Sequence, residues 1–245
     1  MNNILTIFRR EVAAYFNSPV AYIFISMFVF FLAVLLFVLP FQFFQQENPD
    51  LRNFFTVFPW ILSIFIPAVT MRLWSEEKRS GTIELLMTWP LQAWEIVIGK
   101  YLAGLFVIAV SLALTLIVPL VLSSVTSIDW GLVFTSYLGA LLISSVYVAL
   151  GACASTLTSN QIVSLLIATA FSLVMATIGF PPVVRFLNDI FEGMGKFIGW
   201  FGTYRQFADF SKGLVNPVGL IYSFSLTVFF LVLTNLFVEG RKFRG

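Results

Sequence analysis

The chain has 245 residues, of which 59% are hydrophobic and only 11% are charged, whereas a soluble domain typically carries about 25% charged residues. Its net charge of +2 is too small to indicate a nucleic-acid partner, and its single cysteine, Cys153, excludes an internal disulfide. The sequence has no histidine, which excludes histidine-bound metal sites and Ser-His-Asp triads. The composition predicts an all-α membrane protein, forming a single transmembrane domain over residues 1–245.

Long stretches without any charged residue predict six membrane-spanning helices. Four of these stretches have room for one helix of about 20 residues, the length that crosses the hydrocarbon. A fifth stretch, from Trp130 to Val184, has room for two helices, and its polar string from Ser155 to Gln161 indicates the turn between them. We expect the spans at residues 20–41, 57–72, 101–122, 133–154, 162–180 and 217–238.

Residues 1–18 predict an amphipathic helix in front of the first span. Its apolar side chains share one helical face, Arg9 and Arg10 lie elsewhere, and Asn17-Ser18-Pro19 then interrupts the helix. This pattern is typical of a helix that lies in the membrane interface. The alternative is a frayed extension of the first span. The apolar face consists of Ile4, Leu5, Phe8, Val12, Tyr15 and Phe16.

The connection between spans two and three, residues 72–100, carries the most functional information. A charged cluster is followed by Ser80-Gly81-Thr82, a signal for a helix start, and Glu84 suits the first turn of that helix. Pro90 limits the helix to about two turns, which is too short to be stable in water alone. It must therefore dock, either on the bilayer surface or on a cytoplasmic protein, and the pattern leaves both open. Its apolar face consists of Ile83, Leu86 and Met87.

Small residues recur every four positions on the fifth span. Such a stripe lets two helix backbones approach closely. The partner is either a second copy of the protein or another span of the same chain, and the spacing does not separate these alternatives. The stripe consists of Ser164, Ala168, Ser172 and Ala176.

The connection between spans five and six, residues 181–216, predicts outer interfacial or re-entrant helices. One apolar stripe runs from Phe186 to Ile198, with charged residues on the opposite face, which favours one interfacial helix there. Thr203 and Gln206 then have the spacing of a capping box. The segment is either a lid over an outward opening or a structural return to span six.

The distribution of basic residues predicts the orientation of the chain. With the N-terminus inside, nine Lys and Arg residues lie in cytoplasmic segments and five in outer ones. This excess favours both termini in the cytoplasm of a multi-pass protein of the cell (inner) membrane.

Two other classes of membrane protein compete with a transporter driven by a partner. Ion- or proton-driven carriers usually place charged residues inside the membrane, but the five long stretches that supply the spans have none. A Na⁺-coupled carrier would be left with hydroxyls such as Thr115, Ser144 and Ser145. An intramembrane enzyme could use the pair Glu76-Glu77, but there is no histidine beside it, and every lysine falls in a predicted connection. We therefore expect no enzymatic activity in this chain.

The segment 72–100 resembles that of the ABC-2 family of ABC transporter permeases. The matching residues are Arg72, Glu76-Glu77, Arg79-Ser80-Gly81-Thr82-Ile83-Glu84-Leu85-Leu86, Trp89-Pro90 and Gly99-Lys100, and near the end of the chain Phe207-Ala208-Asp209-Phe210-Ser211-Lys212-Gly213. The sequence looks most similar to permeases of the gliding-motility-associated and nitrous-oxide-reductase-maturation type. The six-span pattern covers essentially the whole chain.

This resemblance implies a coupling helix from about Gly81 to Pro90 that sits in a cleft of a separate ATP-binding subunit. The residues expected to couple to that subunit are Glu76, Glu77, Arg79, Gly81, Thr82, Ile83, Glu84, Leu85, Leu86, Met87 and Pro90. It also implies that two permeases pair, partly through span five, which favours the stripe from Ser164 to Ala176 as a dimer contact.

The resulting prediction is the permease subunit of an ATP-driven exporter with two ATPase subunits and a second permease, identical or homologous. The chain has no G-x-x-x-x-G-K-[ST] sequence, so ATP and magnesium would bind to the partner ATPase, and no cofactor is expected here. The alternatives are a membrane anchor that transmits ATPase motion without transport, and an ATP-independent carrier. The sequence specifies neither the substrate nor the direction of transport.

Overall fold

The computed structural model describes residues 2–38, 51–82, 91–124, 126–190 and 192–242. Within these ranges the secondary structure is helical and there is no strand, which confirms the all-α prediction. The helices are α1 (Asn2–Phe16), α2 (Pro19–Val38), α3 (Arg52–Thr56), α4 (Phe58–Thr70), α5 (Arg72–Ser80), α7 (Ala93–Thr115), α8 (Ile117–Ser123), α9 (Trp130–Ser155), α10 (Gln161–Ile178), α11 (Pro181–Ile190), α12 (Met194–Gly199), α13 (Thr203–Phe210) and α14 (Pro217–Lys242).

Among the described residues, five helical segments are long and apolar enough to cross a membrane, and they match five of the six predicted spans. A sixth crossing is counted if α1 and α2, which are bent by 71° relative to each other, form one broken span. The five segments are Phe58–Ser80, Ala93–Ser123, Trp130–Ser155, Gln161–Ile178 and Pro217–Gly240.

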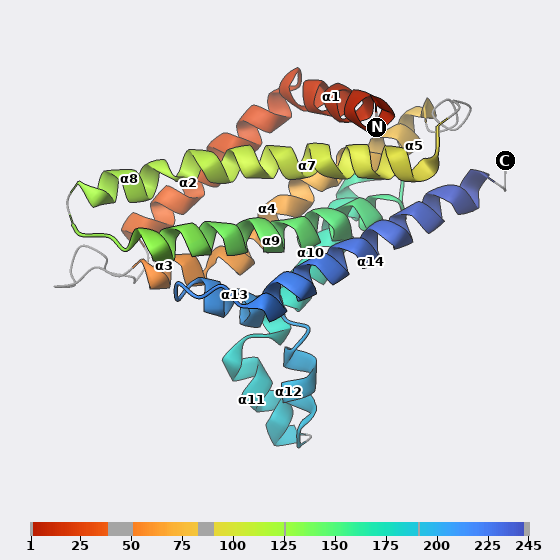
Figure 1. The fold of residues 1–245 in the computed structure, drawn as a ribbon. Coiled ribbons are helices and arrows are strands. Elements are labelled where there is room, and N and C mark those ends of the chain that lie inside the picture. The colour runs from red at the N-terminus through yellow and green to blue at the C-terminus, as the bar shows by residue number, and fades with distance from the viewer. Residues whose placement is uncertain (1, 39–50, 83–90, 125, 191, 243–245) are drawn as a thin grey trace.

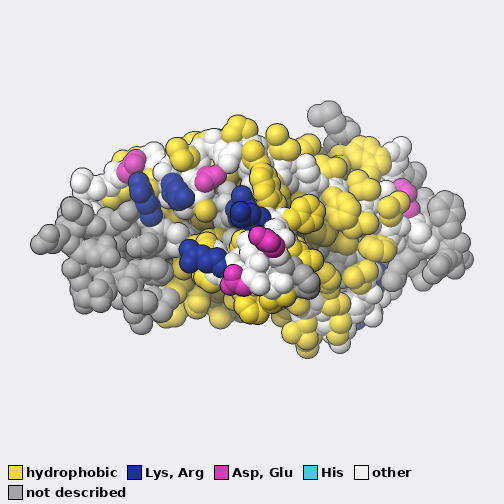
Figure 2. Space-filling model, turned by 90° about the horizontal axis from the view of Figure 1, so that it is seen from below, with side chains coloured by type: hydrophobic (Ala, Val, Ile, Leu, Met, Phe, Trp, Pro, Cys, Tyr) yellow, Lys and Arg dark blue, Asp and Glu magenta, His cyan; other side chains and the backbone are white. Residues whose placement is uncertain are grey.

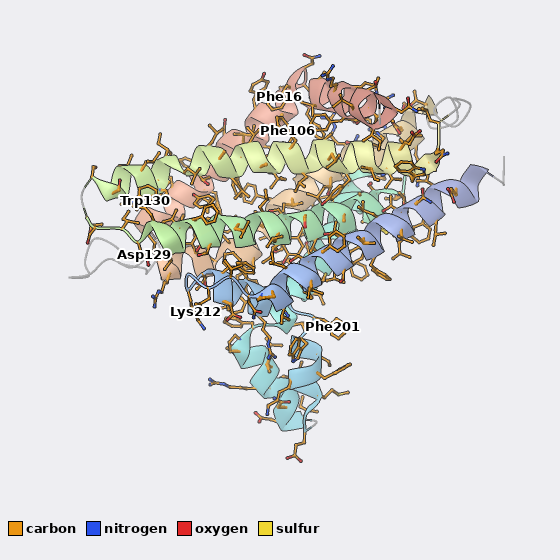
Figure 3. The ribbon with its side chains drawn as sticks, in the orientation of Figure 1. Phe16, Phe106, Asp129, Trp130, Phe201 and Lys212 are labelled. Atoms are coloured by element: carbon orange, nitrogen blue, oxygen red, sulfur yellow. The ribbon has the colours of Figure 1, made fainter. Side chains whose placement is uncertain are left out.

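Helix α9 is the central element of the bundle, in contact with α4, α7, α10, α13 and α14 (Figure 1). Its glycines let the neighbours approach closely. A Cβ at Gly139 would lie 2.6 Å from Cβ of Phe210, and one at Gly151 would lie 2.0 Å from Oγ1 of Thr70. At the start of α9, Asp129 accepts backbone hydrogen bonds and caps the helix, with Trp130 beside it (Figure 3).

Helix α1 packs along α7, not on the end of α2 as a straight extension (Figure 1). A Cβ at Gly99 would lie 2.7 Å from Cγ2 of Ile7, so the Ile7 side chain packs directly on the backbone of α7 at this glycine. The rings of Phe8 and Phe106 meet edge to face, 5.7 Å between centroids. The helix predicted over residues 1–18 is therefore present, and the break at Asn17-Ser18-Pro19 is confirmed.

The segment between α10 and α14 forms three short helices instead of one stripe. Helices α11 and α12 make a hairpin that projects from the bundle (Figure 1), because Gly193 reverses the chain at φ 83°. Within the hairpin α12 lies against α11, and a Cβ at Gly199 would be 2.8 Å from Cγ2 of Val184. The prediction of one continuous interfacial helix from Phe186 to Ile198 is therefore wrong, because α11 ends at Ile190 and α12 begins at Met194.

The hairpin exposes both apolar and charged side chains. Phe186 and Phe197 are among its most exposed apolar residues, at 63% and 70%. Seen from below, charged side chains gather around the hairpin beside a broad apolar surface (Figure 2). At its base, Phe201 and Lys212 point in different directions (Figure 3).

The predicted capping box at Thr203 and Gln206 is not formed. The N-cap of α13 is Gly202, and the hydroxyl of Thr203 instead lies 2.6 Å from that of Tyr147 on α9. The amide of Gln206 donates to the carbonyl of Trp200. A buried tertiary hydrogen bond has replaced the local cap, which sequence spacing alone could not show.

The close contact at Gly151 gives a direct test of the packing around α9. Gly151→Val should lower the stability of the protein in detergent by about 1–3 kcal/mol or more, because the new side chain collides with Thr70. Gly240→Val is the matched control, since a Cβ at Gly240 meets nothing within 4 Å. Thermal unfolding measures both variants, and equal melting temperatures would contradict the packing.

Candidate functional site

The first part of the predicted coupling segment is helical. Glu76, Glu77 and Arg79 lie on α5, and Gly81 ends that helix with φ 71°, a left-handed conformation that favours glycine. The sequence analysis expects Ser80-Gly81-Thr82 to start a helix. In the structure, α5 ends at this point. The rest of the predicted segment, Ile83, Glu84, Leu85, Leu86, Met87 and Pro90, lies outside the described residues.

Helix α5 continues α4 and presents two different faces. Leu73, Trp74 and Ser75 are buried, and Trp74 is among the largest fully buried side chains. Lys78 donates to the carbonyl of Thr156, which ties α5 to the end of α9. Arg79 is exposed at the end of the helix. One face of α5 is thus fixed in the bundle while its last turn reaches the surface.

Four charged side chains from α1, α5 and α7 form a closed ring, here called the charge ring: Arg10, Glu11, Glu77 and Lys100. Nζ of Lys100 lies 3.1 Å from Oε1 of Glu11 and 2.9 Å from Oε1 of Glu77. Nη2 of Arg10 lies 2.6 Å from the same oxygen of Glu11 and 3.3 Å from that of Glu77. Each carboxylate is therefore shared by both cations.

The charge ring is shielded from water to different degrees. The side chain of Lys100 is 2% exposed, those of Glu11 and Glu77 are 14% exposed, and that of Arg10 is 47% exposed. Lys100 also lies over the ring of Trp74, 5.4 Å from its centroid. Burial of these charges is costly unless they are paired, so the four must be retained together.

The balance within the charge ring sets the pKa of Glu11. Burial of its carboxyl acts to raise this pKa, but the charges and hydrogen bonds of Lys100 and Arg10 outweigh burial and lower it below the usual 4.5. The stabilisation from ionised Glu11 is therefore complete above pH 4.5 and is lost as the pH falls through the lowered value.

Sequence reasoning missed the charge ring because it placed Lys100 in a connection. Helix α7 begins at Ala93, before the predicted start of span three at residue 101, so Lys100 lies well inside the helix. The signal was Gln92 and Glu95, which have capping-box spacing: the Glu95 carboxylate accepts from the backbone N–H of Gln92. Asn3 of α1 also donates to Glu95, at 3.1 Å.

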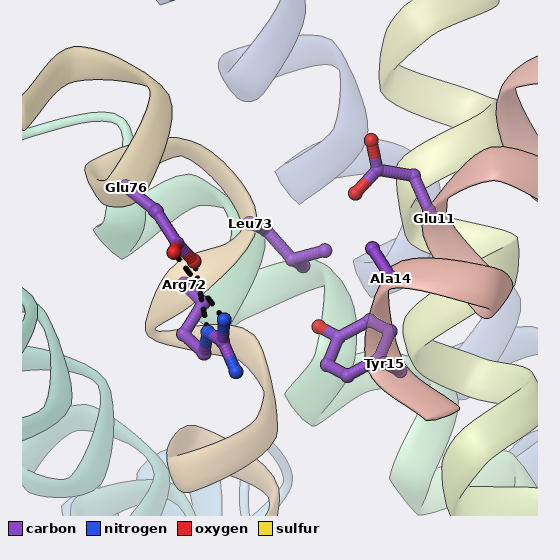
Figure 4. Close-up of a pocket in the computed structure, with 6 residues that line it drawn as sticks. All are labelled: Glu11, Ala14, Tyr15, Arg72, Leu73 and Glu76. Atoms are coloured by element: carbon purple, nitrogen blue, oxygen red, sulfur yellow. Dashed lines mark hydrogen bonds and ion pairs between the residues drawn. The ribbon is translucent and has the colours of Figure 1, made fainter. Parts of the chain in front are cut away.

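A small polar cavity of about 50 Å³ lies beside the charge ring, between α1 and α5 (Figure 4). Arg72 and Glu76 of α5 form an ion pair of 2.8 Å on one side, and α1 contributes the opposite side. The hydroxyl of Tyr15 donates to the carbonyl of Val69. The cavity has room for a few water molecules among polar partners. Its lining consists of Glu11, Ala14, Tyr15, Arg72, Leu73 and Glu76.

The charge ring joins α5 and α7, at the two ends of the predicted coupling segment, to the N-terminal helix α1 within a bundle of long apolar helices. The family model for the ABC-2 family transporter protein matches residues 5–241, almost the whole chain. The chain belongs to the ABC-2 family. It is thus a multi-pass membrane protein of a family whose members are transport subunits, not themselves catalytic, and normally work with an ABC ATPase. A search among curated proteins found no match.

The small residues of this ABC-2 protein's α10 face its own bundle. Ser164, Ala168, Ser172 and Ala176 are all fully buried within the chain. The hydroxyl of Ser172 donates to the carbonyl of Ser63 on α4, at 2.6 Å. This burial matches the alternative of packing within one chain, because the stripe allows α10 to approach its neighbours closely. Their role as a dimer contact stays a prediction.

The hydroxyls considered for a Na⁺-coupled carrier are occupied by bonds within the bundle. Ser144 donates to the carbonyl of Ala140, and Ser145 lies 3.1 Å from the hydroxyl of Thr227. Thr115 is on another helix, α7, where it donates to Leu112. Each of these three hydroxyls thus has a hydrogen-bond partner within the bundle.

Two alanines on α10 separate packing within the chain from dimer contact. Ala168→Leu should lower the melting temperature of the monomer, because Ala168 is fully buried, whereas Ala170→Leu should leave it unchanged because Ala170 is exposed. Thermal unfolding and size-exclusion chromatography measure stability and assembly separately. A loss of dimer with unchanged monomer stability in Ala168→Leu would restore the dimer interpretation.

Proposed function

We propose that this chain is the permease subunit of an ATP-driven exporter, placed in the cell (inner) membrane with both termini in the cytoplasm. Family membership supports transport as the activity. The observation that carries the proposal is the charge ring, because it gathers the two arms of the coupling segment, α5 and α7, onto α1. A segment with such a base is suited to receive force from another protein.

The partner would be a pair of ATPase subunits that bind ATP and magnesium themselves. The segment from Gly81 to Pro90 would dock in a cleft of each ATPase through Ile83, Leu86 and Met87. Closure of the ATPases on ATP would then displace α5 and α7, which continue directly into spans. Membership of the ABC-2 family supports this division of labour.

A second permease, identical or homologous, would complete the pathway. The stripe of small residues on α10 packs inside the chain. The two permeases would therefore contact each other through other surfaces, and the opposite face of α10 is one candidate. Ile162 and Leu166 are 66% and 63% exposed there, and Val174 is 52% exposed. Their spacing gives a continuous apolar stripe, which suits either a second helix or lipid.

A membrane anchor that transmits ATPase motion without transport is the second candidate. The same charge ring and coupling arms would serve it equally. The projecting hairpin α11–α12 supports the membrane-anchor function, because it presents exposed side chains beyond the end of α10 (Figure 1). A partner protein outside the membrane could bind there.

Co-purification tests whether an ATPase is the partner. The tagged protein is extracted from native membranes in mild detergent, beside a variant with Ile83, Leu86 and Met87 changed to Asp. We expect a P-loop ATPase with the wild type and at least about tenfold less with the variant, because the apolar docking face is lost. Absence of any ATPase from the wild type under several gentle conditions would favour an ATP-independent carrier.

Backbone geometry at Gly81 tests the coupling itself. Gly81→Pro should leave membrane insertion intact but uncouple ATP hydrolysis from function, because proline cannot adopt the φ of 71° that ends α5. Glu84→Lys should uncouple likewise, through lost polar contact with the ATPase. Gly193→Pro is the control, since it alters a similar backbone at φ 83° in the outer hairpin. Normal coupling in Gly81→Pro and Glu84→Lys would rule out the assignment of this segment as a coupling helix.

A further inference from the structure

The charge ring closes around the base of the coupling segment. Glu77 lies four residues before Gly81, where α5 ends, and Lys100 lies in the second turn of α7, after the chain has returned. The other two members of the charge ring, Arg10 and Glu11, are adjacent on α1. Three helices that enter or leave this end of the bundle are thus held by one set of ion pairs.

The contacts of Lys100 differ from those of an ordinary surface lysine. Its ammonium bonds Oε1 of two carboxylates from different helices and lies over Trp74, with 2% of the side chain exposed. Salt in solution screens such a shielded pair weakly. The formal charges of the four residues sum to zero, so loss of one charge leaves the other three unbalanced in a poorly hydrated place.

The other contacts of α1 are divided between the two arms. Ile7 at Gly99 and Asn3 at Glu95 hold α1 against α7. Toward α5 the packing includes the polar cavity of about 50 Å³, so that part of this boundary is not filled by side chains. The charge ring bridges α1 to α5 next to this cavity and links both to α7.

We propose that Lys100 is a positioning residue that makes α1, α5 and α7 move as one body when the coupling segment is displaced. This role rests on the proposed function for the source of the displacement. The mechanical link itself is a property of the permease alone and can be measured without any ATPase.

The ion-pair account makes a specific prediction about paired substitutions. Lys100→Met removes one cation and leaves two carboxylates with Arg10 alone. Adding Glu77→Gln removes one carboxylate and leaves the balanced pair of Arg10 and Glu11. The double variant should therefore behave more like the wild type than the single variant does, whereas a role of Lys100 in packing alone predicts additive damage.

Hydrogen exchange of the purified permease in nanodiscs, read by mass spectrometry, tests this prediction. We expect exchange of the α1 amides to rise at least about tenfold in Lys100→Met and to return most of the way in Lys100→Met/Glu77→Gln. Arg79→Gln, an exposed charge of α5 outside the ring, is the control and should exchange like the wild type. Wild-type exchange in Lys100→Met, or additive damage in the double variant, would overturn the proposal.

A second single variant and a measurement of ATP hydrolysis separate the role of Lys100 from the proposed function. Glu77→Gln preserves the shape of the side chain, so it can replace Lys100→Met as the single variant if the latter does not insert. In complexes with the co-purified ATPase, the single variant should retain ATPase binding but lose the effect of the permease on ATP hydrolysis, and the double variant should regain it. If no ATPase co-purifies while the exchange result holds, the proposed function fails and the role of Lys100 stands.

Discussion

Burial of charge at one end of an apolar bundle is the constraint on which the rest of the architecture depends. Lys100, with 2% of its side chain exposed, is paired with Glu11 and Glu77, which are brought to it from two other helices. This requirement fixes where α1 crosses α7 and how α5 leaves α4. Because Glu77 and Lys100 lie on the two arms of the coupling segment, the requirement also fixes the base of that segment.

Small residues provide the close packing that the charge ring needs. Gly99 lets α1 lie directly on α7, one residue before Lys100, and Gly151 lets α9 lie directly on α4. Ser172 of α10 then reaches the backbone of α4. Displacement of α5 would therefore pass through α4 to α9 and α10 by direct contact, in a core too closely packed to absorb it locally.

The sequence predicted the features that depend on local patterns, namely the all-α class, five of the six expected crossings, the break after α1 and the turn between α9 and α10. It could not predict features that depend on distant partners. Thr203 looked like a helix cap but bonds Tyr147. The small stripe of α10 looked like a dimer contact but is buried in its own bundle, where Ala168 lies among apolar residues of α9. Lys100 was expected in a connection because a charge directly before a long uncharged stretch looks like a boundary. In the structure, Glu11 and Glu77, which are distant in sequence, pair with it inside a helix.

Force from a separate ATPase can reach the bundle only if the segment following α5 contacts that ATPase. A photoreactive amino acid placed at Leu86 in native membranes tests it most directly, with the same group at Phe134, a 70% exposed residue of α9, as control. We expect a covalent adduct between position 86 and a P-loop ATPase and none from position 134. Adducts from position 86 to lipid alone would place the segment on the bilayer surface and contradict a coupling role.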